Sequence, residues 1–161
     1  MLLMAIDPGN IDSAYVIVDE DMCIHEKGKV KNETLRQLII HRPEITEYAI
    51  EMIASYGMAV GKEVFETCVW IGRFAECAVH VNNQAKVSFV YRAEEKQTIC
   101  KSMKANDSNI RQALIDMYAQ HDFKNGKGTK SNPDYFHGFA KDIWAAFAVA
   151  HTYMEKLKYG I

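Results

Sequence analysis

The chain has 161 residues, of which 48% are apolar and 25% charged, and its formal net charge is −2. These values are typical of one soluble globular domain with a core large enough to fold unaided, and we expect that domain to span residues 1–161. No apolar stretch approaches the ~20 residues of a membrane helix, and the short apolar start lacks the basic flank of a signal peptide, so we expect a cytoplasmic protein without membrane contacts.

The first third of the chain is predicted to supply most of a sheet. Apolar and β-branched runs indicate strands over residues 1–7, 13–19 and 22–30. Because short turns join them, we expect an antiparallel meander. A short helix is predicted over residues 33–40, and the apolar run at 47–54 is typical of a further strand.

The rest of the chain alternates helices with one more strand. Val60, Val64 and Cys68 recur at helical spacing, with Phe65 beside them, which predicts a long helix that packs this side on the sheet. Trp70 and Phe74 would lie on its other side, either in a dimer contact or in ordinary core packing. The complete set of segments expected here is a helix over 58–80, a strand over 86–93, helices over 95–102 and 107–119, a loop over 123–134 and a helix over 137–157. This order favours an α/β fold with one central, mixed five-stranded sheet flanked by helices.

Three carboxylates occur where apolar residues would be expected. Asp7 ends the first strand, Glu51 interrupts an apolar run, and Asp142 lies near the start of the apolar final helix. A buried carboxylate needs a partner, because burying an unpaired charge is costly. Hard oxygen ligands without clustered His or Cys favour Mg²⁺ or Mn²⁺. Such a site can hold two ions roughly 4 Å apart for phosphodiester cleavage.

Each of these acids also has a simpler interpretation. Asp7 stands in Asp-Pro-Gly, which is a strong turn sequence. Glu51 could be a half-exposed strand residue, and Asp142 could be an acid favoured by the dipole of a helix N-terminus. The sequence alone leaves these alternatives open.

Basic residues are concentrated in one later segment. Between Lys96 and Lys130 there are seven Lys and Arg residues against three Asp, whereas acids outnumber bases six to three between Arg42 and Glu76. A local basic region can contact phosphates even in a slightly acidic chain. The alternative is an ordinary solvated loop and helix surface.

The order of these motifs resembles the RuvC-type Holliday junction resolvases, in particular their phage and prophage versions, within the ribonuclease H-like superfamily. The resemblance spans nearly the whole chain, and its most specific stretch is KQTICKSMKANDSNIRQAL at 96–114. The other matching segments are AIDPGNIDSAYVIVD at 5–19, AIEMIA at 49–54, VWIGRFAECAVHV at 69–81 and KDIWAAFAVAHTY at 141–153.

The resemblance implies a ribonuclease H-like fold and a crossover junction endodeoxyribonuclease. It implies a homodimer that resolves four-way DNA junctions by paired nicks, each leaving a 5′-phosphate and a 3′-hydroxyl. Asp7, Glu51 and Asp142 would be the catalytic metal ligands for two Mg²⁺ or Mn²⁺ ions in each active site. The residues expected to hold DNA phosphates are Lys96, Lys101, Lys104 and Arg111.

The sequence departs from the family pattern at two positions. A fourth metal ligand is expected about one helical turn before the last Asp, but the residue three positions before Asp142 is Phe139. His137 is near, and it is a doubtful fourth ligand, a proton carrier or a plain loop residue. Asp107 occupies a second position that is basic in the family, where Lys101 or Lys104 could substitute.

Three other functions are compatible with these residues. The protein could cut flaps, forks or three-way branches with little preference for four-way junctions. It could be a DNA-binding factor that keeps the fold without catalysis. A ribonuclease acting on RNA–DNA hybrids is a more distant possibility, since the chain has no separate basic hairpin for hybrids.

Overall fold

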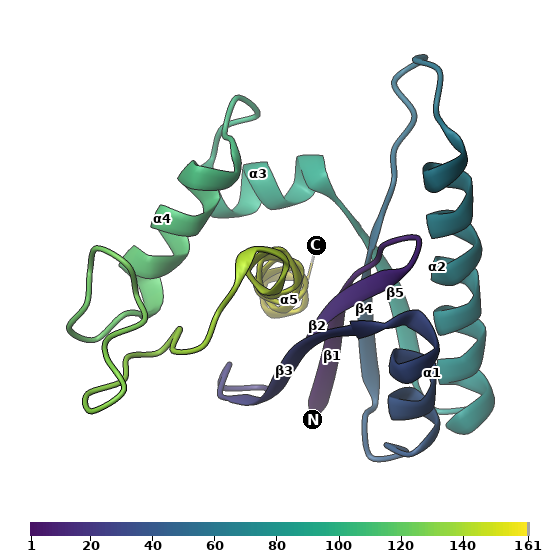
Figure 1. Cartoon of the computed structure of the whole chain (residues 1–161), viewed down its shortest axis with the longest axis horizontal. Helices are drawn as coiled ribbons and strands as arrows, with labels where there is room; N and C mark the ends of the chain where they lie inside the picture. The colour runs from purple at the N-terminus through teal and green to yellow at the C-terminus, as the bar shows by residue number, and fades with distance from the viewer. Residues whose placement is uncertain (161) are drawn as a thin grey trace.

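The computed structural model describes residues 1–160; Ile161, the last residue of the expected domain, lies outside the described residues. The strands form one five-stranded sheet in the order β3-β2-β1-β4-β5. Helices lie on both faces of this sheet (Figure 1). The elements are β1 (Leu2–Asp7), β2 (Asp12–Asp19), β3 (Ile24–Lys31), α1 (Asn32–Ile40), β4 (Glu47–Met52), α2 (Lys62–Val81), β5 (Lys86–Tyr91), α3 (Arg92–Cys100), α4 (Asp107–Tyr118) and α5 (Lys141–Tyr159).

The sheet is mixed, as predicted. β1 pairs antiparallel with β2, and β2 pairs antiparallel with β3, so the predicted meander is confirmed. β4 lies parallel to β1 on its other side, and β5 lies parallel to β4. β1 is the central strand because its side chains from Leu3 to Ile6 are apolar and completely buried between the two helical layers.

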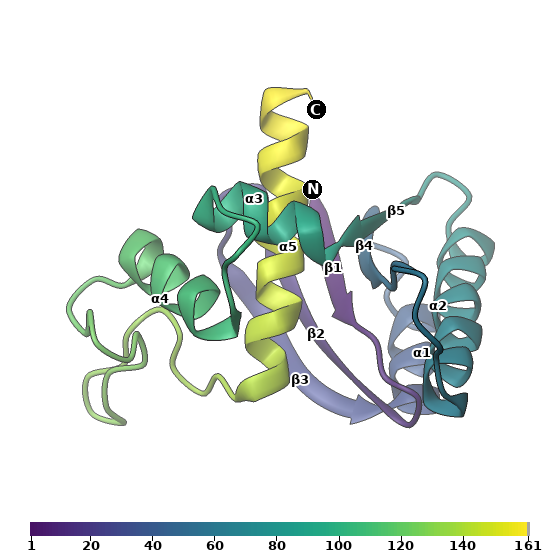
Figure 2. The same ribbon diagram turned by 90° about the horizontal axis from the view of Figure 1, so that it is seen from above.

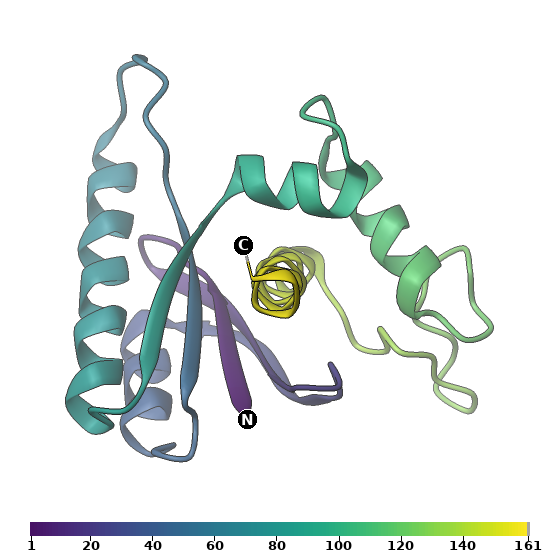
Figure 3. The same ribbon diagram turned by 180° about the vertical axis from the view of Figure 1, so that it is seen from behind.

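Two apolar cores lie on opposite faces of the sheet. Helices α1 and α2 cover one face, and α5 covers the other, with α3 and α4 outside α5 (Figures 1 and 3). Side chains of β1 alternate between these cores: Leu3 and Ala5 pack toward α5, whereas Met4 and Ile6 pack toward α1 and α2. Because Asp7 follows Ala5 by two residues, this alternation places Asp7 on the face toward α5.

The long helix α2 differs from the prediction in its start and in its buried face. It begins at Lys62 rather than at residue 58, after two glycines, Gly57 and Gly61. Phe65 is 63% exposed, so the predicted packing of the Val64, Cys68 and Phe65 side on the sheet is wrong. The buried residues of α2 are Thr67, Ile71, Phe74 and Ala78.

The last helix also begins later than predicted. α5 starts at Lys141 instead of residue 137, because Gly138 adopts a left-handed φ of 80° that a right-handed helix cannot contain. His137 and Phe139 therefore belong to the preceding loop rather than to the helix. None of the helices within residues 1–160 combines the length and apolar character required to cross a membrane.

Candidate active site

Two of the three acids lie side by side at one edge of the sheet. Asp7 is the last residue of β1, and the register between the parallel strands pairs Ile6 with Ile50. Glu51, the next residue of β4, therefore lies beside Asp7. Since Ala5 and Ala49 face α5, the alternation along each strand turns both carboxylates toward the same side.

The third acid reaches the same place from the end of the chain. Asp142 lies in the first turn of α5, which packs against β1 and β2. The helix runs opposite to β1, so its first turn lies toward the end of the sheet at which β1 finishes (Figure 2). Asp7, Glu51 and Asp142 line one cleft of about 360 Å³. Segments more than 40 residues apart in sequence thus contribute to one acidic site.

The loop after Asp7 is fixed by a buried polar network. The Ser13 hydroxyl donates to Asn32 Oδ1 at 2.6 Å and accepts from the Gly9 N–H, and Asn32 Nδ2 donates to the Gly9 carbonyl. A Cβ at Gly9 would stand 2.3 Å from the Asp12 carbonyl oxygen, so this close approach requires glycine. The network therefore holds the end of β1, and with it Asp7.

Burial and the neighbouring acids disfavour the ionisation of Asp7. Burial raises the pKa of Asp7 to about 8, and the neighbouring Glu51 and Asp142 carboxylates add to the shift. The cleft is consequently a place where a cation would be stabilised, because it would compensate carboxylates that water reaches only in part.

One of these carboxylates is already engaged by a lysine. Lys29 Nζ of β3 donates to Asp142 Oδ2 at 2.5 Å, and the two side chains are 50% and 35% exposed. Partly exposed ion pairs of this kind contribute little stability and exchange readily. Asp142 is therefore not neutralised in the interior.

The donor set fits a divalent cation. Within residues 1–160, no three His, Cys, Asp or Glu side chains already stand close enough to hold one metal ion. Asp142 is instead paired with the Lys29 ammonium group. The convergent side chains nevertheless offer hard carboxylate oxygens, which Mg²⁺ and Mn²⁺ prefer.

Sequence reasoning missed two residues beside these acids, Arg92 and Glu95. The guanidinium group of Arg92, at the start of α3, lines the cleft and forms ion pairs with Glu95 and with Asp107. Glu95 is completely buried, and burial raises its pKa to about 9, with the charge of Glu51 as the next contribution. Its position four residues before buried Ile99, on the same helical face, was the available signal.

The basic residues predicted to bind DNA are distributed unequally. Arg111 lines the cleft, and its guanidinium lies over the Trp144 ring at 5.4 Å. Lys141, which was not predicted, lines it too. Lys101 and Lys104 are exposed and Lys96 is half-buried, all three outside the cleft lining among the described residues.

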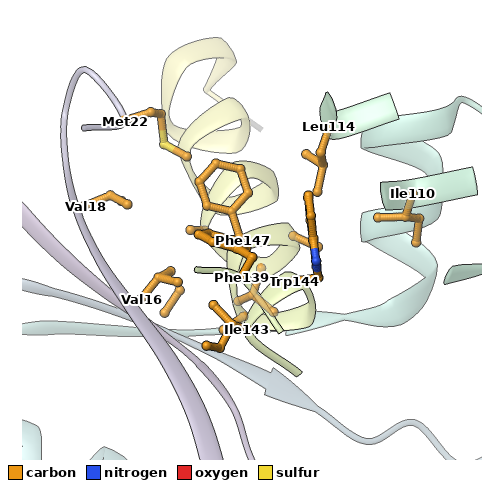
Figure 4. Packing of buried hydrophobic residues seen from close by; sticks show 14 of the residues in the cluster. Val16, Val18, Met22, Ile110, Leu114, Phe139, Ile143, Trp144 and Phe147 are labelled. Atoms are coloured by element: carbon orange, nitrogen blue, oxygen red, sulfur yellow. The ribbon is translucent and has the colours of Figure 1, made fainter. Parts of the chain in front are cut away.

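The two residues weighed as a fourth ligand lie elsewhere. His137 is exposed, and its Nδ1 lies 3.2 Å from the Lys127 carbonyl oxygen, away from the cleft lining described for residues 1–160. Phe139 is 3% exposed and packs against Phe136 and Trp144, with ring centroids 5.0 and 5.1 Å apart. Figure 4 shows Phe139 inside the apolar cluster with Trp144 and Phe147.

The sequence matches no protein-family model and no curated protein. Solved structures do match the fold. The structure is similar to that of Thermus thermophilus RuvC, with a TM-score of 0.74 and 13% identity over 99% of this chain and 97% of that chain. It is similar to T. thermophilus RuvC in complex with Holliday junction substrate, with a TM-score of 0.72 and 13% identity over 99% and 96% of the two chains.

The yeast mitochondrial Holliday junction resolvase Ydc2 is less similar, with a TM-score of 0.50 and 13% identity over 98% of this chain and 80% of that chain. The fold that the resemblance implies is thus confirmed. The chain has the fold of the RuvC-type Holliday junction resolvases, which is a ribonuclease H-like fold.

Proposed function

We propose that this protein is a divalent-metal-dependent endonuclease that resolves four-way DNA junctions as a homodimer. The observation that supports this most is the convergence of Asp7, Glu51 and Asp142 on one cleft of a RuvC-like fold. One of the similar structures is a RuvC bound to a Holliday junction substrate, which supports branched DNA as the substrate class.

In this proposal the three carboxylates would hold two Mg²⁺ or Mn²⁺ ions. When bound, such ions polarise the scissile phosphate and lower the pKa of water to generate a nucleophile, which would leave a 5′-phosphate and a 3′-hydroxyl. Asp7 and Glu51 are fixed by the sheet, so they meet the substrate without reorganisation. Asp142 must release Lys29 before it can join them.

Basic side chains in and near the cleft would position the DNA backbone. Arg111 is held by its stacking on Trp144, and Lys141 adjoins Asp142 in the first turn of α5. Both line the cleft with the acids, so both can contact a phosphate next to the one being cut. Lys96, Lys101 and Lys104 would contact phosphates farther from the reacting group.

A homodimer is proposed because paired nicks in a two-fold junction require paired sites. Trp70 and Phe74 were open to either a dimer contact or core packing, and both pack against the core, with Trp70 half-buried beside Phe74. Phe74 is completely buried, whereas Phe65 and Val69 of α2 are 63% and 54% exposed, with Gly72 one turn further. This exposed row on α2 is the proposed dimer contact.

The test is a nicking assay on a synthetic four-way junction with Mg²⁺, run beside Asp7→Asn and Glu51→Gln. We expect the wild-type protein to cut and both variants to lose at least a hundredfold in rate while still binding the junction. Three-way junctions, linear duplex and RNA–DNA hybrid serve as comparison substrates. If all branched substrates are cut equally, the protein is a general endonuclease for branched DNA and not a four-way junction resolvase. If the wild type and both variants cut equally, the roles assigned to Asp7 and Glu51 are wrong.

A further inference from the structure

Helix α3 contains a buried carboxylate that the proposed mechanism does not use. The side chain of Glu95 has no exposed surface, and its Oε2 atom has no hydrogen-bond partner. A buried polar atom without a partner costs free energy, and native proteins keep such atoms when a ligand, ion or water engages them. Glu95 therefore requires an explanation.

Glu95 lies next to two acids of the cleft, although it is fully buried and is not among the cleft-lining residues described for 1–160. The acids whose charges act on it are Glu51 and Asp7, from β4 and β1. Its other oxygen, Oε1, lies 3.4 Å from the Arg92 guanidinium, which also forms an ion pair with Asp107. The charge of Arg92 thus acts on Asp7, Glu95 and Asp107 together, so one guanidinium group faces more than one acid.

The segment before α5 does not supply the fourth ligand. The family resemblance leads one to expect a carboxylate at position 139, but Phe139 precedes α5 and is packed among aromatic rings (Figure 4). His137 is exposed and hydrogen-bonded elsewhere. The start of α5 therefore lacks the expected acid, whereas α3 carries an unpartnered carboxylate oxygen next to Glu51 and Asp7.

We propose that Glu95 supplies the fourth carboxylate of the metal site, in place of a ligand from the start of α5. This inference rests on the proposed function, since it concerns the same cleft and the same cation. It assigns to α3, through the free oxygen of Glu95, a role in metal binding besides the contacts of its basic residues with DNA.

The test measures Mn²⁺ binding without DNA, by calorimetric titration and by the electron paramagnetic resonance signal of free Mn²⁺. Glu95→Gln is compared with Glu94→Gln, a matched control on the adjacent residue, which binds Lys156 outside the cleft. We expect Glu95→Gln to weaken Mn²⁺ binding by at least tenfold, as loss of a ligand or its supporting group does, and Glu94→Gln to change it less than twofold.

Thermal unfolding without metal separates ligation from a structural role. Glutamine matches the volume of Glu95, keeps an oxygen that can face Arg92 and removes a carboxyl group whose ionisation burial disfavours, so the Tm of metal-free Glu95→Gln should be no lower than that of the wild type. If the amide prevents folding, Glu95→Met fills the same space without polar atoms and should show the same loss of Mn²⁺ affinity.

The outcomes distinguish this inference from the proposed function. Wild-type affinity in Glu95→Gln, with binding lost in Asp7→Asn, overturns the role of Glu95 and leaves the three-acid site standing. Equal losses in Glu95→Gln and Glu94→Gln overturn it as well, since they indicate a general disturbance of α3. A wild-type protein that takes up no Mn²⁺ at millimolar concentration overturns both.

Discussion

At the scale of single residues, Asp7 links the stability of the metal-free protein to pH. Its pKa is raised from 3.8 to about 8, so between these pH values the folded state binds a proton that the unfolded state releases. The free energy of unfolding must therefore fall as pH rises through this window. The destabilising penalty of ionising the buried Asp7 is complete above pH 8.

Asp7→Asn removes this penalty. Without metal, we expect the variant to be more stable than the wild type at pH 8 by the order of 1–3 kcal/mol, with little difference at pH 4. Urea unfolding at both pH values, in the presence of a chelator, measures it. Asp116→Asn, an exposed acid in α4, is the control. A variant that loses stability equally at both pH values would contradict the assigned burial of a charge.

Lys29 competes with a cation for Asp142. Lys29→Met removes the positive charge beside this carboxylate, so we expect Mn²⁺ affinity to rise about three- to tenfold, consistent with one unit charge at close range in a partly solvated site. Calorimetric titration measures the change. The control is Lys31→Met, two residues along β3, where the lysine pairs with Asp12. Weaker Mn²⁺ binding in Lys29→Met would show that Lys29 supports the metal site instead of competing with it.

At the scale of elements, the turn before α5 is built for packing rather than for ligation. Restoring an acid there by Phe139→Asp should lower the free energy of unfolding by about 4 kcal/mol or more, because the ring is buried and the new carboxylate would have no partner. Denaturant unfolding measures this. Phe123→Asp, at a 58% exposed site, should cost less than 1 kcal/mol. A stable Phe139→Asp with higher Mn²⁺ affinity would contradict the account.

Helix α2 carries the proposed dimer contact. Val69→Asp places a charge in the middle of its exposed apolar row, and we expect the dimer dissociation constant to rise at least tenfold. Light scattering after size-exclusion chromatography measures the oligomeric state. Met117→Asp, at an exposed site on α4, should leave the dimer unchanged. If wild-type protein is monomeric at high concentration, the dimer proposal is wrong.

The helices also show where sequence patterns stop being informative. The apolar residues of α2 cover a wide arc, so the period alone could not decide between the side with Phe65 and the side with Ile71 and Phe74. Only the position of α2 over β4 and β5 determines which side of the helix is buried. The start of α5 was misplaced because Ala-rich sequence favours helix and Gly138 alone marks the break.

At the scale of the whole molecule, the antiparallel meander and the mixed five-stranded sheet were predictable from the sequence, and the residues around the acids only in part. Asp7, Glu51 and Asp142 stood out because each interrupts apolar sequence. Glu95 and Arg92 did not, because the segment Arg-Ala-Glu-Glu-Lys has the composition of a solvated helix surface. The burial of Glu95 and the partial burial of Arg92 result from α3 packing against α5 after a parallel strand, which is a tertiary contact.

The central claim is that three distant carboxylates form one metal site. Anomalous diffraction from a crystal of the protein grown with Mn²⁺ tests it most directly. We expect a manganese peak in the cleft within ligand distance of Asp7, Glu51 and Asp142, with the contact between Lys29 and Asp142 broken. Manganese absent from the cleft at saturating concentration, with Asp142 still bound to Lys29, would contradict the account.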